Sequence, residues 1–188
     1  MRFILGFLTA LVLLVIAAAA LVYSGWYNVA AVEGFHPGLA WALHTTMERS
    51  VRQHAAGLVP PADLQALAPN GFDDFDEMCV QCHGAPGKEK GEVGKGLAPQ
   101  APDLVDAAQR WRPAQIFWIV KNGVHMTGMP AFGRTHEDQR LWAIVAFVST
   151  LPSIAPEKYE EMIAKNSGKG SQSDDRHKEH TPSEPHHH

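Results

Sequence analysis

The sequence predicts an all-α protein with one apolar N-terminal helix, a short amphipathic helical segment and one small helical domain. An uncharged run opens the chain, and apolar residues recur at helical spacing in several later segments. No segment alternates apolar and polar residues for long enough to indicate a strand. The chain has 188 residues, which leaves room for one modest core and some extensions.

The first 27 residues are predicted to form a membrane anchor. Residues 3–23 carry no charge, and as a helix they would span about 31 Å, close to the thickness of a bilayer core. Trp26 and Tyr27 follow where an interfacial aromatic belt belongs. A cleaved signal peptide is the alternative, although the run exceeds the usual signal core of about 7–15 residues. Membrane lipid is therefore an expected partner, and Arg2 favours an N-terminus on the inner side.

Residues 28–70 are predicted to form a helical spacer or a docking segment. An apolar side chain recurs at every fourth position of this segment, at Leu39, Leu43, Met47, Val51 and Ala55. That spacing is one stripe of an amphipathic helix, and a pair of prolines ends it. His36, His44 and His54 are interpreted as surface residues, with a second metal or a b-type haem as the alternative.

Residues 71–155 are predicted to form the compact domain. Its helices are expected to include residues 113–121, with proline in the first turn and glycine after the end, and residues 137–151. Residues 156–188 are polar and contain several histidines, so we expect a disordered tail after a short helical extension. Metal binding by these histidines is the alternative to a solvated tail or the remnant of a tag.

The short stretch from Cys79 to His83 carries the strongest chemical signal. The pattern Cys-x-x-Cys-His is the attachment signature of c-type haem. Two thiols three residues apart can each add to a vinyl group of one porphyrin, and the histidine four residues after Cys79 lies on the same side of a helix. Its imidazole can then bind the iron. The sequence predicts one covalently attached haem c held by Cys79, Cys82 and His83.

Other roles for the cysteine pair agree less well with the sequence. A structural zinc site needs four nitrogen or sulfur ligands, and the chain has only these two cysteines. A thioredoxin-like redox pair belongs in a βαβ setting, which the helical pattern does not provide. The net charge is −4 with no basic stripe, so nucleic acid is not an expected partner.

A second iron ligand is predicted in the glycine-rich stretch that follows residue 122. The candidates are His125, Met126, Met129 and His136. Met129 is favoured because it precedes a proline in a loop and because a thioether raises the reduction potential relative to a second histidine. Methionine more often fills a core, but a loop of this composition is a poor place for a core residue.

Residues 70–153 resemble class I c-type cytochromes, namely the bacterial, membrane-anchored monohaem members with a Met-Pro-Ala-Phe-Gly ligand loop. They share the haem motif, the loop at 129–133 and a closing helix with Trp142 and Phe147. The resemblance implies an all-α cytochrome c domain in which the first and last helices cross near the haem. It implies that His83 and Met129 are the two protein ligands of the haem iron, which is then six-coordinate.

The resemblance also implies two supporting residues after the haem motif. In this family a proline carbonyl accepts a hydrogen bond from Nδ1 of the haem histidine, and a nearby leucine packs on the porphyrin. Pro102 and Leu104 match these positions, with Pro99 as the alternative proline. Such a bond would set the tautomer and ring angle of His83.

The implied function is electron transfer rather than catalysis, in a single-pass protein of the bacterial inner membrane with its haem domain in the periplasm. The implied partners are a redox donor and acceptor, such as a quinol-oxidising complex, a dehydrogenase or a terminal oxidase. One alternative is a fixed haem c subunit of a larger membrane redox complex. Another is a haem sensor or small peroxidase with an open iron position.

Overall fold

The computed structural model describes residues 2–177, and within that range it contains helices and connecting segments without strands. The all-α expectation is therefore confirmed. The chain divides into two compact units, of which the first ends at Gly34 and the second begins at Phe35. The first unit thus extends beyond the expected limit at residue 27.

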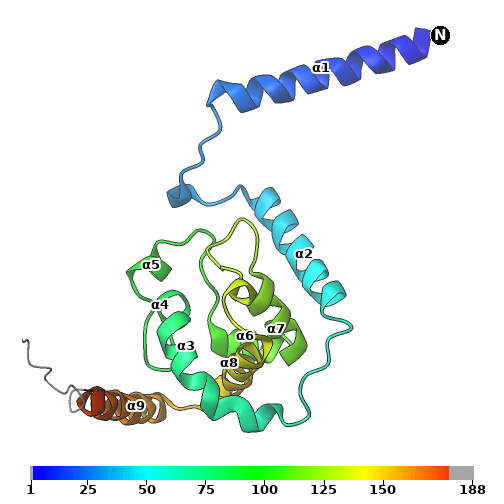
Figure 1. Cartoon of the computed structure of the whole chain (residues 1–188). Helices are drawn as coiled ribbons and strands as arrows, with labels where there is room; N and C mark the ends of the chain where they lie inside the picture. Colours follow the sequence, from blue (N-terminus) through cyan, green and yellow to red (C-terminus); the bar gives the residue numbers. More distant parts are fainter. Residues whose placement is uncertain (1, 178–188) are drawn as a thin grey trace, which may run out of the picture. The chain divides into compact units, whose positions relative to one another are not determined.

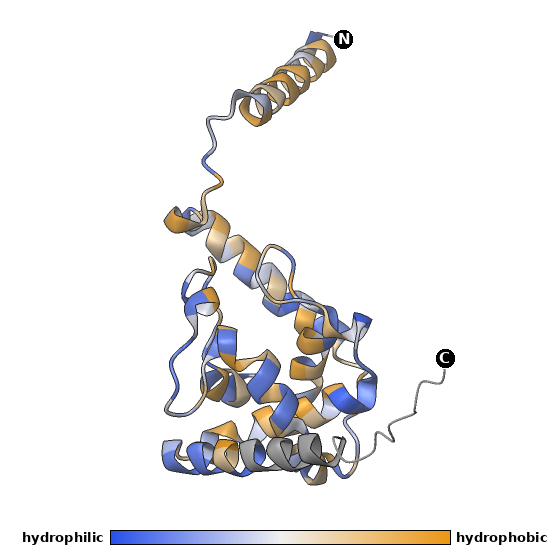
Figure 2. Cartoon of the chain, turned by 60° about the vertical axis from the view of Figure 1, so that its left-hand side comes forward, coloured by the Kyte–Doolittle hydropathy of each residue, from blue (hydrophilic) through white to orange (hydrophobic). Residues whose placement is uncertain are grey.

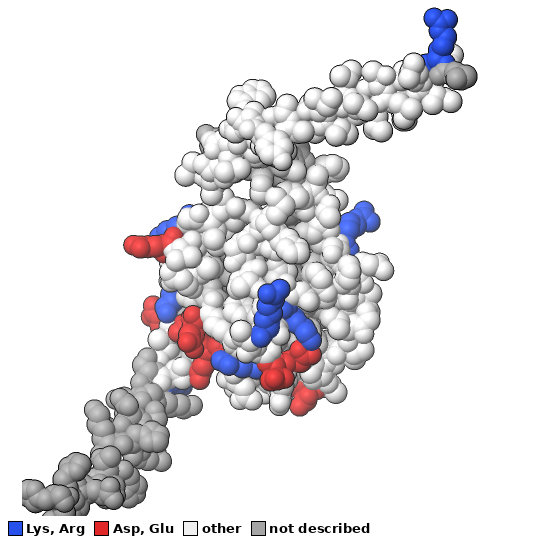
Figure 3. Space-filling view, turned by 45° about the horizontal axis from the view of Figure 1, so that its top comes forward, with Lys and Arg blue, Asp and Glu red and all other residues white. Residues whose placement is uncertain are grey.

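The first unit is built on helix α1 (Arg2–Ser24), followed by the short helix η1 (Ala31–Glu33). No residue of α1 is buried against protein. Figure 2 shows hydrophobic colour along nearly all of α1, and Figure 3 shows charged atoms on it only at its N-terminal end. Among the described residues, α1 is the one helix whose length and composition suit a membrane span.

The second unit is a cluster of short helices around α8 (Figure 1). The predicted helices at 113–121 and 137–151 appear as α7 and α8, and the stripe of the amphipathic segment forms α2. The helices of this unit are α2 (Pro37–His54), η2 (Leu64–Gly71), α3 (Phe72–Met78), α4 (Val80–His83), α5 (Glu92–Lys95), α6 (Leu104–Arg110), α7 (Pro113–Asn122), η3 (Phe132–Arg134), α8 (Asp138–Thr150), η4 (Leu151–Ser153) and α9 (Pro156–His177).

Helix α8 forms the centre of the core, because every residue from 141 to 148 is buried. Phe72 and Phe75 of α3 pack against Phe147, with ring centroids 5.4 and 5.0 Å away. Directly before α3, the backbone at Gly71 meets the backbone of α8. A Cβ atom on Gly71 would lie 2.0 Å from the carbonyl oxygen of Ala143. Glycine is therefore required for this helix crossing, which brings the segment before the haem motif onto α8.

A buried carboxylate holds the same crossing. Asp74 of α3 is 9% exposed and accepts two hydrogen bonds from the guanidinium of Arg140, at 2.7 and 2.5 Å. A bidentate pair of this kind fixes relative orientation as well as distance. The direction of α3, and of the motif that follows it, is thus set by α8.

Residues 28–70 were predicted to form a helical spacer or a docking segment, and from Phe35 onward they belong to the second unit. Val51 of α2 is fully buried and Ala55 is 3% exposed, so the second half of the apolar stripe is buried within this unit. Glu48 pairs with Arg110 of α6, and the ring of His54 lies 5.5 Å from that of Trp118. These contacts attach α2 to α6 and α7, which residue periodicity alone could not indicate.

The short helical extension expected after residue 155 corresponds to α9, which runs from Pro156 to His177 and is longer than expected. Tyr159 is fully buried against Phe72 and Phe75, and its hydroxyl donates a 2.7 Å hydrogen bond to Asp76. A single aromatic residue in a polar segment therefore extends the domain. The expected tail at 178–188 lies outside the described residues.

Candidate haem site

The two cysteines and His83 are carried by one helical turn. Cys79 lies between α3 and α4, and the amide of His83 donates to the Cys79 carbonyl over 2.9 Å. Gly84 ends the turn with a φ of 73°, a left-handed conformation that glycine adopts without strain. Both thiols are free and half-buried, so they are available for the predicted thioether bonds.

The Cys79 thiol is held in its protonated form. Burial, the nearby charge of Asp74 and the second thiol of Cys82 together raise the pKa of Cys79 to about 12. A structural zinc site needs deprotonated thiolates, so this environment does not favour one. No group of three or more His, Cys, Asp and Glu side chains that could hold a metal ion occurs in the part of the chain that the structure describes.

His83 is oriented by the hydrogen bond that the family resemblance predicts. Its Nδ1–H donates to the carbonyl oxygen of Pro102 over 2.8 Å. This assigns the proton to Nδ1 and leaves the lone pair on Nε2 for the iron. Burial lowers the pKa of His83, which keeps the imidazole neutral at neutral pH despite the bond to Pro102. Pro102 rather than Pro99 supplies the carbonyl.

The segment that carries this carbonyl is held at several points. The carboxylate of Asp103 caps α6 by accepting a 2.7 Å hydrogen bond from the Val105 amide. Leu104 is half-buried against the core. The ammonium of Lys90 donates to the Ala101 carbonyl. The Pro102 acceptor therefore belongs to a braced loop, as an orienting partner should.

The loop after α7 carries three of the four candidates for the second ligand and gives their side chains different surroundings. Met129 is half-buried and packs against the core, whereas Met126 is 61% exposed and His125 is exposed. The Met129 amide donates to the Thr127 hydroxyl over 3.1 Å, and its carbonyl accepts a 3.2 Å bond from Val124. The loop thus turns Met129 inward and leaves the other two side chains outside. His136, the fourth candidate, bonds to the hydroxyl of its neighbour.

Two contacts near the site were not predicted from the sequence. Gly94 of α5 lies against the haem-motif turn, where a Cβ would be 2.6 Å from the Cys82 carbonyl oxygen. The other contact is the ion pair between Glu48 and Arg110, which joins α2 to α6. The repeated glycines between residues 84 and 96 are the signal that could have indicated the first contact.

The residues that a c-type haem needs are thus present in suitable states. Two free thiols lie three residues apart, and a neutral histidine presents Nε2. A thioether-bearing side chain, Met129, packs against the same core. Thiols, imidazole and thioether form the donor set of a His/Met-ligated haem c.

Comparison with known families agrees with this chemistry. Residues 66–148 match the model of the family described as cytochrome c oxidase, cbb3-type, subunit III. The chain therefore has a cytochrome c domain after its apolar N-terminal helix. The match covers the haem motif, Pro102, Leu104, Met129 and α8 as far as residue 148, and a cytochrome c domain implies haem c and haem-based electron transfer. No curated protein matches the chain.

Proposed function

We propose that this protein is a membrane-anchored electron carrier with one covalently attached haem c. Cys79 and Cys82 would form the thioether bonds, and His83 and Met129 would be the axial ligands. When bound, the haem iron supplies reversible one-electron oxidation and reduction. The observation that carries the proposal is the 2.8 Å bond from His83 Nδ1 to Pro102, which leaves Nε2 for a metal.

The residues of the chain have distinct tasks in this proposal. Pro102 holds the imidazole angle and increases its basicity as a ligand. Leu104 would cover the bound haem and exclude water, and the thioether of Met129 would bind the iron together with His83, which would leave no position for a substrate. A carrier that moves only an electron needs little rearrangement. The braced loops around His83 and Met129 are consistent with that need.

The proposed location is the bacterial inner membrane, with α1 as a single span and the haem domain in the periplasm. A helix that is apolar on every side and unburied by protein requires an apolar medium. The length of the apolar run, which exceeds the usual signal core of about 7–15 residues, favours an anchor over a cleaved signal peptide. Partners would be a quinol-oxidising complex or dehydrogenase as donor and a terminal oxidase as acceptor.

A second candidate function is a fixed haem c subunit of a larger redox complex, and the match to an oxidase subunit family favours it. Purification in mild detergent separates the two functions. An isolated carrier is expected to elute as a single chain, whereas a fixed subunit is expected to elute with other polypeptides. A sensor or peroxidase, in contrast, would bind carbon monoxide readily in its reduced form.

The proposed axial ligand is tested by the spectrum of Met129→Ala beside that of the wild type. We expect loss of the methionine–iron charge-transfer band at the red end of the visible spectrum and a lower reduction potential, because the thioether raises the potential. Met126→Ala is the matched control and should retain both. If the band survives in Met129→Ala and disappears in Met126→Ala, Met126 is the ligand and the assignment to Met129 is wrong.

A further inference from the structure

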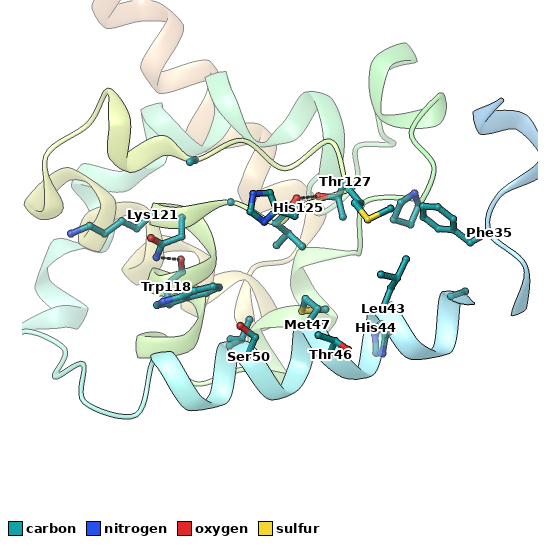
Figure 4. A pocket seen from close by; sticks show the side chains of 18 of the residues that line it. Phe35, Leu43, His44, Thr46, Met47, Ser50, Trp118, Lys121, His125 and Thr127 are labelled. Carbon is teal, nitrogen blue, oxygen red and sulfur yellow. Dashed lines mark hydrogen bonds between the residues drawn. The ribbon is translucent and has the colours of Figure 1, made fainter. Parts of the chain in front are cut away.

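A large cavity lies outside the proposed haem site, between α2 and the loop that follows α7. Its volume is about 1050 Å³. Helix α2 forms one wall and residues 123–127 form part of the opposite wall (Figure 4). Ligand pockets in proteins measure about 300–1,000 Å³, so the cavity has room for a ring compound together with part of a hydrocarbon chain.

The lining is mostly apolar and has aromatic rings. Leu43 and Met47 of α2 face it, and Phe35 and Trp118 lie toward its two ends (Figure 4). Leu43 and Met47 come from the half of the apolar stripe that does not reach the buried interface around Val51. The stripe therefore has two parts, of which one packs against protein and the other borders the cavity.

The polar lining side chains Thr46, His125 and Arg134 have no side-chain partner among the described residues, and of these the imidazole of His125 can both donate and accept. His125 lies across the cavity from Met47 (Figure 4) and has no hydrogen-bond or ion-pair partner among the described residues. In contrast, the Thr127 hydroxyl already donates to the Val124 carbonyl over 2.7 Å. An imidazole can donate to or accept from a ligand oxygen, so His125 can give orientation within an otherwise apolar space.

The charges of the lining do not form a strong anion site. Lys121 is bound to Asp138, with 2.7 Å between its ammonium nitrogen and a carboxylate oxygen. Arg134 is the other Lys or Arg side chain in the lining. Phosphate and carboxylate ligands are usually held by several converging cations or by bidentate arginine. A neutral ligand with an apolar body and one or two oxygens suits this lining better.

The cavity adjoins the loop that carries the proposed iron ligand. Residues 123–127 and Ala131 line it, whereas Met129 between them packs against the core. The loop is thus a partition between the cavity and the proposed haem site. Met126 in this partition has a φ of 59°, which is uncommon for a residue other than glycine.

We propose that this cavity binds the ring of a neutral, membrane-soluble para-quinone or quinol, with His125 hydrogen-bonded to a ring oxygen. The choice of a membrane-soluble ligand rests on the proposed function, because a bilayer-anchored protein meets such compounds at high local concentration. The binding itself requires neither haem attachment nor Met129 ligation. The volume and the aromatic walls of the cavity suit an apolar ring, and the imidazole of His125 can form a hydrogen bond with an oxygen of that ring.

The test uses the full-length haem-containing protein in phosphatidylcholine vesicles. A photoreactive azido-quinone with a decyl tail is the probe, decylubiquinone is the competitor, and labelled peptides are identified by mass spectrometry. We expect saturable labelling of peptides from α2 and residues 123–127, abolished by the competitor. Labelling confined to α1, or not competed by decylubiquinone, would overturn the proposal.

Variants separate the cavity from general membrane partition. Met47→Trp places a bulky ring in the cavity opposite His125 and should reduce cavity labelling at least about tenfold, because added bulk in a defined site is poorly tolerated. His125→Ala should weaken apparent affinity by about 2- to 10-fold, the worth of one hydrogen bond. Val93→Trp, at an exposed position of α5 outside the lining, is the matched control and should label like the wild type.

Two further outcomes would show that another ligand occupies the cavity or that the proposed iron ligands are wrong. If phosphatidylglycerol in the vesicles displaces the probe and Arg134→Ala abolishes labelling, the site takes an anionic lipid and the quinone proposal is wrong. The visible spectrum of each variant reports folding and iron ligation independently. Absence of the methionine–iron band in the wild type would refute the proposed ligand set without altering the labelling result.

Discussion

The Gly71→Ala substitution tests the helix crossing that positions the haem motif. Gly71 has φ −93° and ψ −6°, a conformation that alanine adopts readily, and alanine has the better helix propensity by about 1 kcal/mol. Local propensity thus predicts a more stable protein. The tertiary structure predicts the opposite, because the new Cβ would lie 2.0 Å from the oxygen and 2.3 Å from the carbon of the Ala143 carbonyl.

The magnitude follows from the kind of atoms that are contacted. Overpacking costs about 1–3 kcal/mol, and here the nearest atoms are backbone of a central helix that cannot rotate away. The upper end of this range, about 3 kcal/mol, applies to such a contact, and after subtraction of about 1 kcal/mol for the propensity gain we expect a loss of about 2 kcal/mol in the free energy of unfolding. For a domain of this size that loss corresponds to a Tm lower by about 8 °C.

The assay is thermal unfolding of the oxidised haem-containing protein, followed by far-ultraviolet circular dichroism. Gly57→Ala is the matched control, since no heavy atom lies within 4 Å of its added Cβ. Its Tm should equal that of the wild type or rise slightly. A Gly71→Ala protein that is as stable as the wild type would refute the close approach of the two backbones.

Three other predictions concern the attachment of α2, the added helix and the haem linkage. Val51→Ala should lower the free energy of unfolding by about 2 kcal/mol because the side chain is fully buried, whereas Val59→Ala, at a position 83% exposed, should change it by less than about 0.5 kcal/mol in urea titration. Tyr159→Phe should cost about 1 kcal/mol for the lost hydrogen bond. Burial raises the pKa of Tyr159, so wild-type stability should fall as the pH rises above about 10, where the unfolded chain ionises, and a fall of equal size in Tyr159→Phe would contradict this role. Replacement of both Cys79 and Cys82 by alanine should remove haem stain from the polypeptide on a denaturing gel, while either single variant should retain it, and stain in the double variant would disprove thioether attachment.

Features that depend on a few neighbouring residues could be predicted from the sequence. The bounds of α7 follow from Pro113 and Gly123, because one favours a first turn and the other adopts the φ of 67° that ends the helix. The apolar helix at the N-terminus follows from the absence of charge over its length. The haem motif is equally local, since the reach of two thiols and one imidazole depends only on helical spacing.

Features that depend on distant segments required the tertiary structure. The choice of Pro102 over Pro99 rests on a hydrogen bond that joins residues 19 positions apart. The inward position of Met129 depends on bonds within its loop and on the core behind it. Neither the choice of proline nor the position of Met129 can be derived from periodicity. The two prolines have similar neighbours in the sequence, and so do the candidate ligands.

The sequence by itself determined the all-helical class, the apolar N-terminal helix and the haem attachment motif, because each is written in consecutive residues. Only the tertiary structure decided that α2 and α9 belong to the haem-binding unit. Val51 and Tyr159 stabilise these additions through burial against segments far away in the chain. The cavity bordered by α2 also depends on the tertiary structure, since Leu43 and Met47 of the apolar stripe border a space whose opposite wall is the loop after α7.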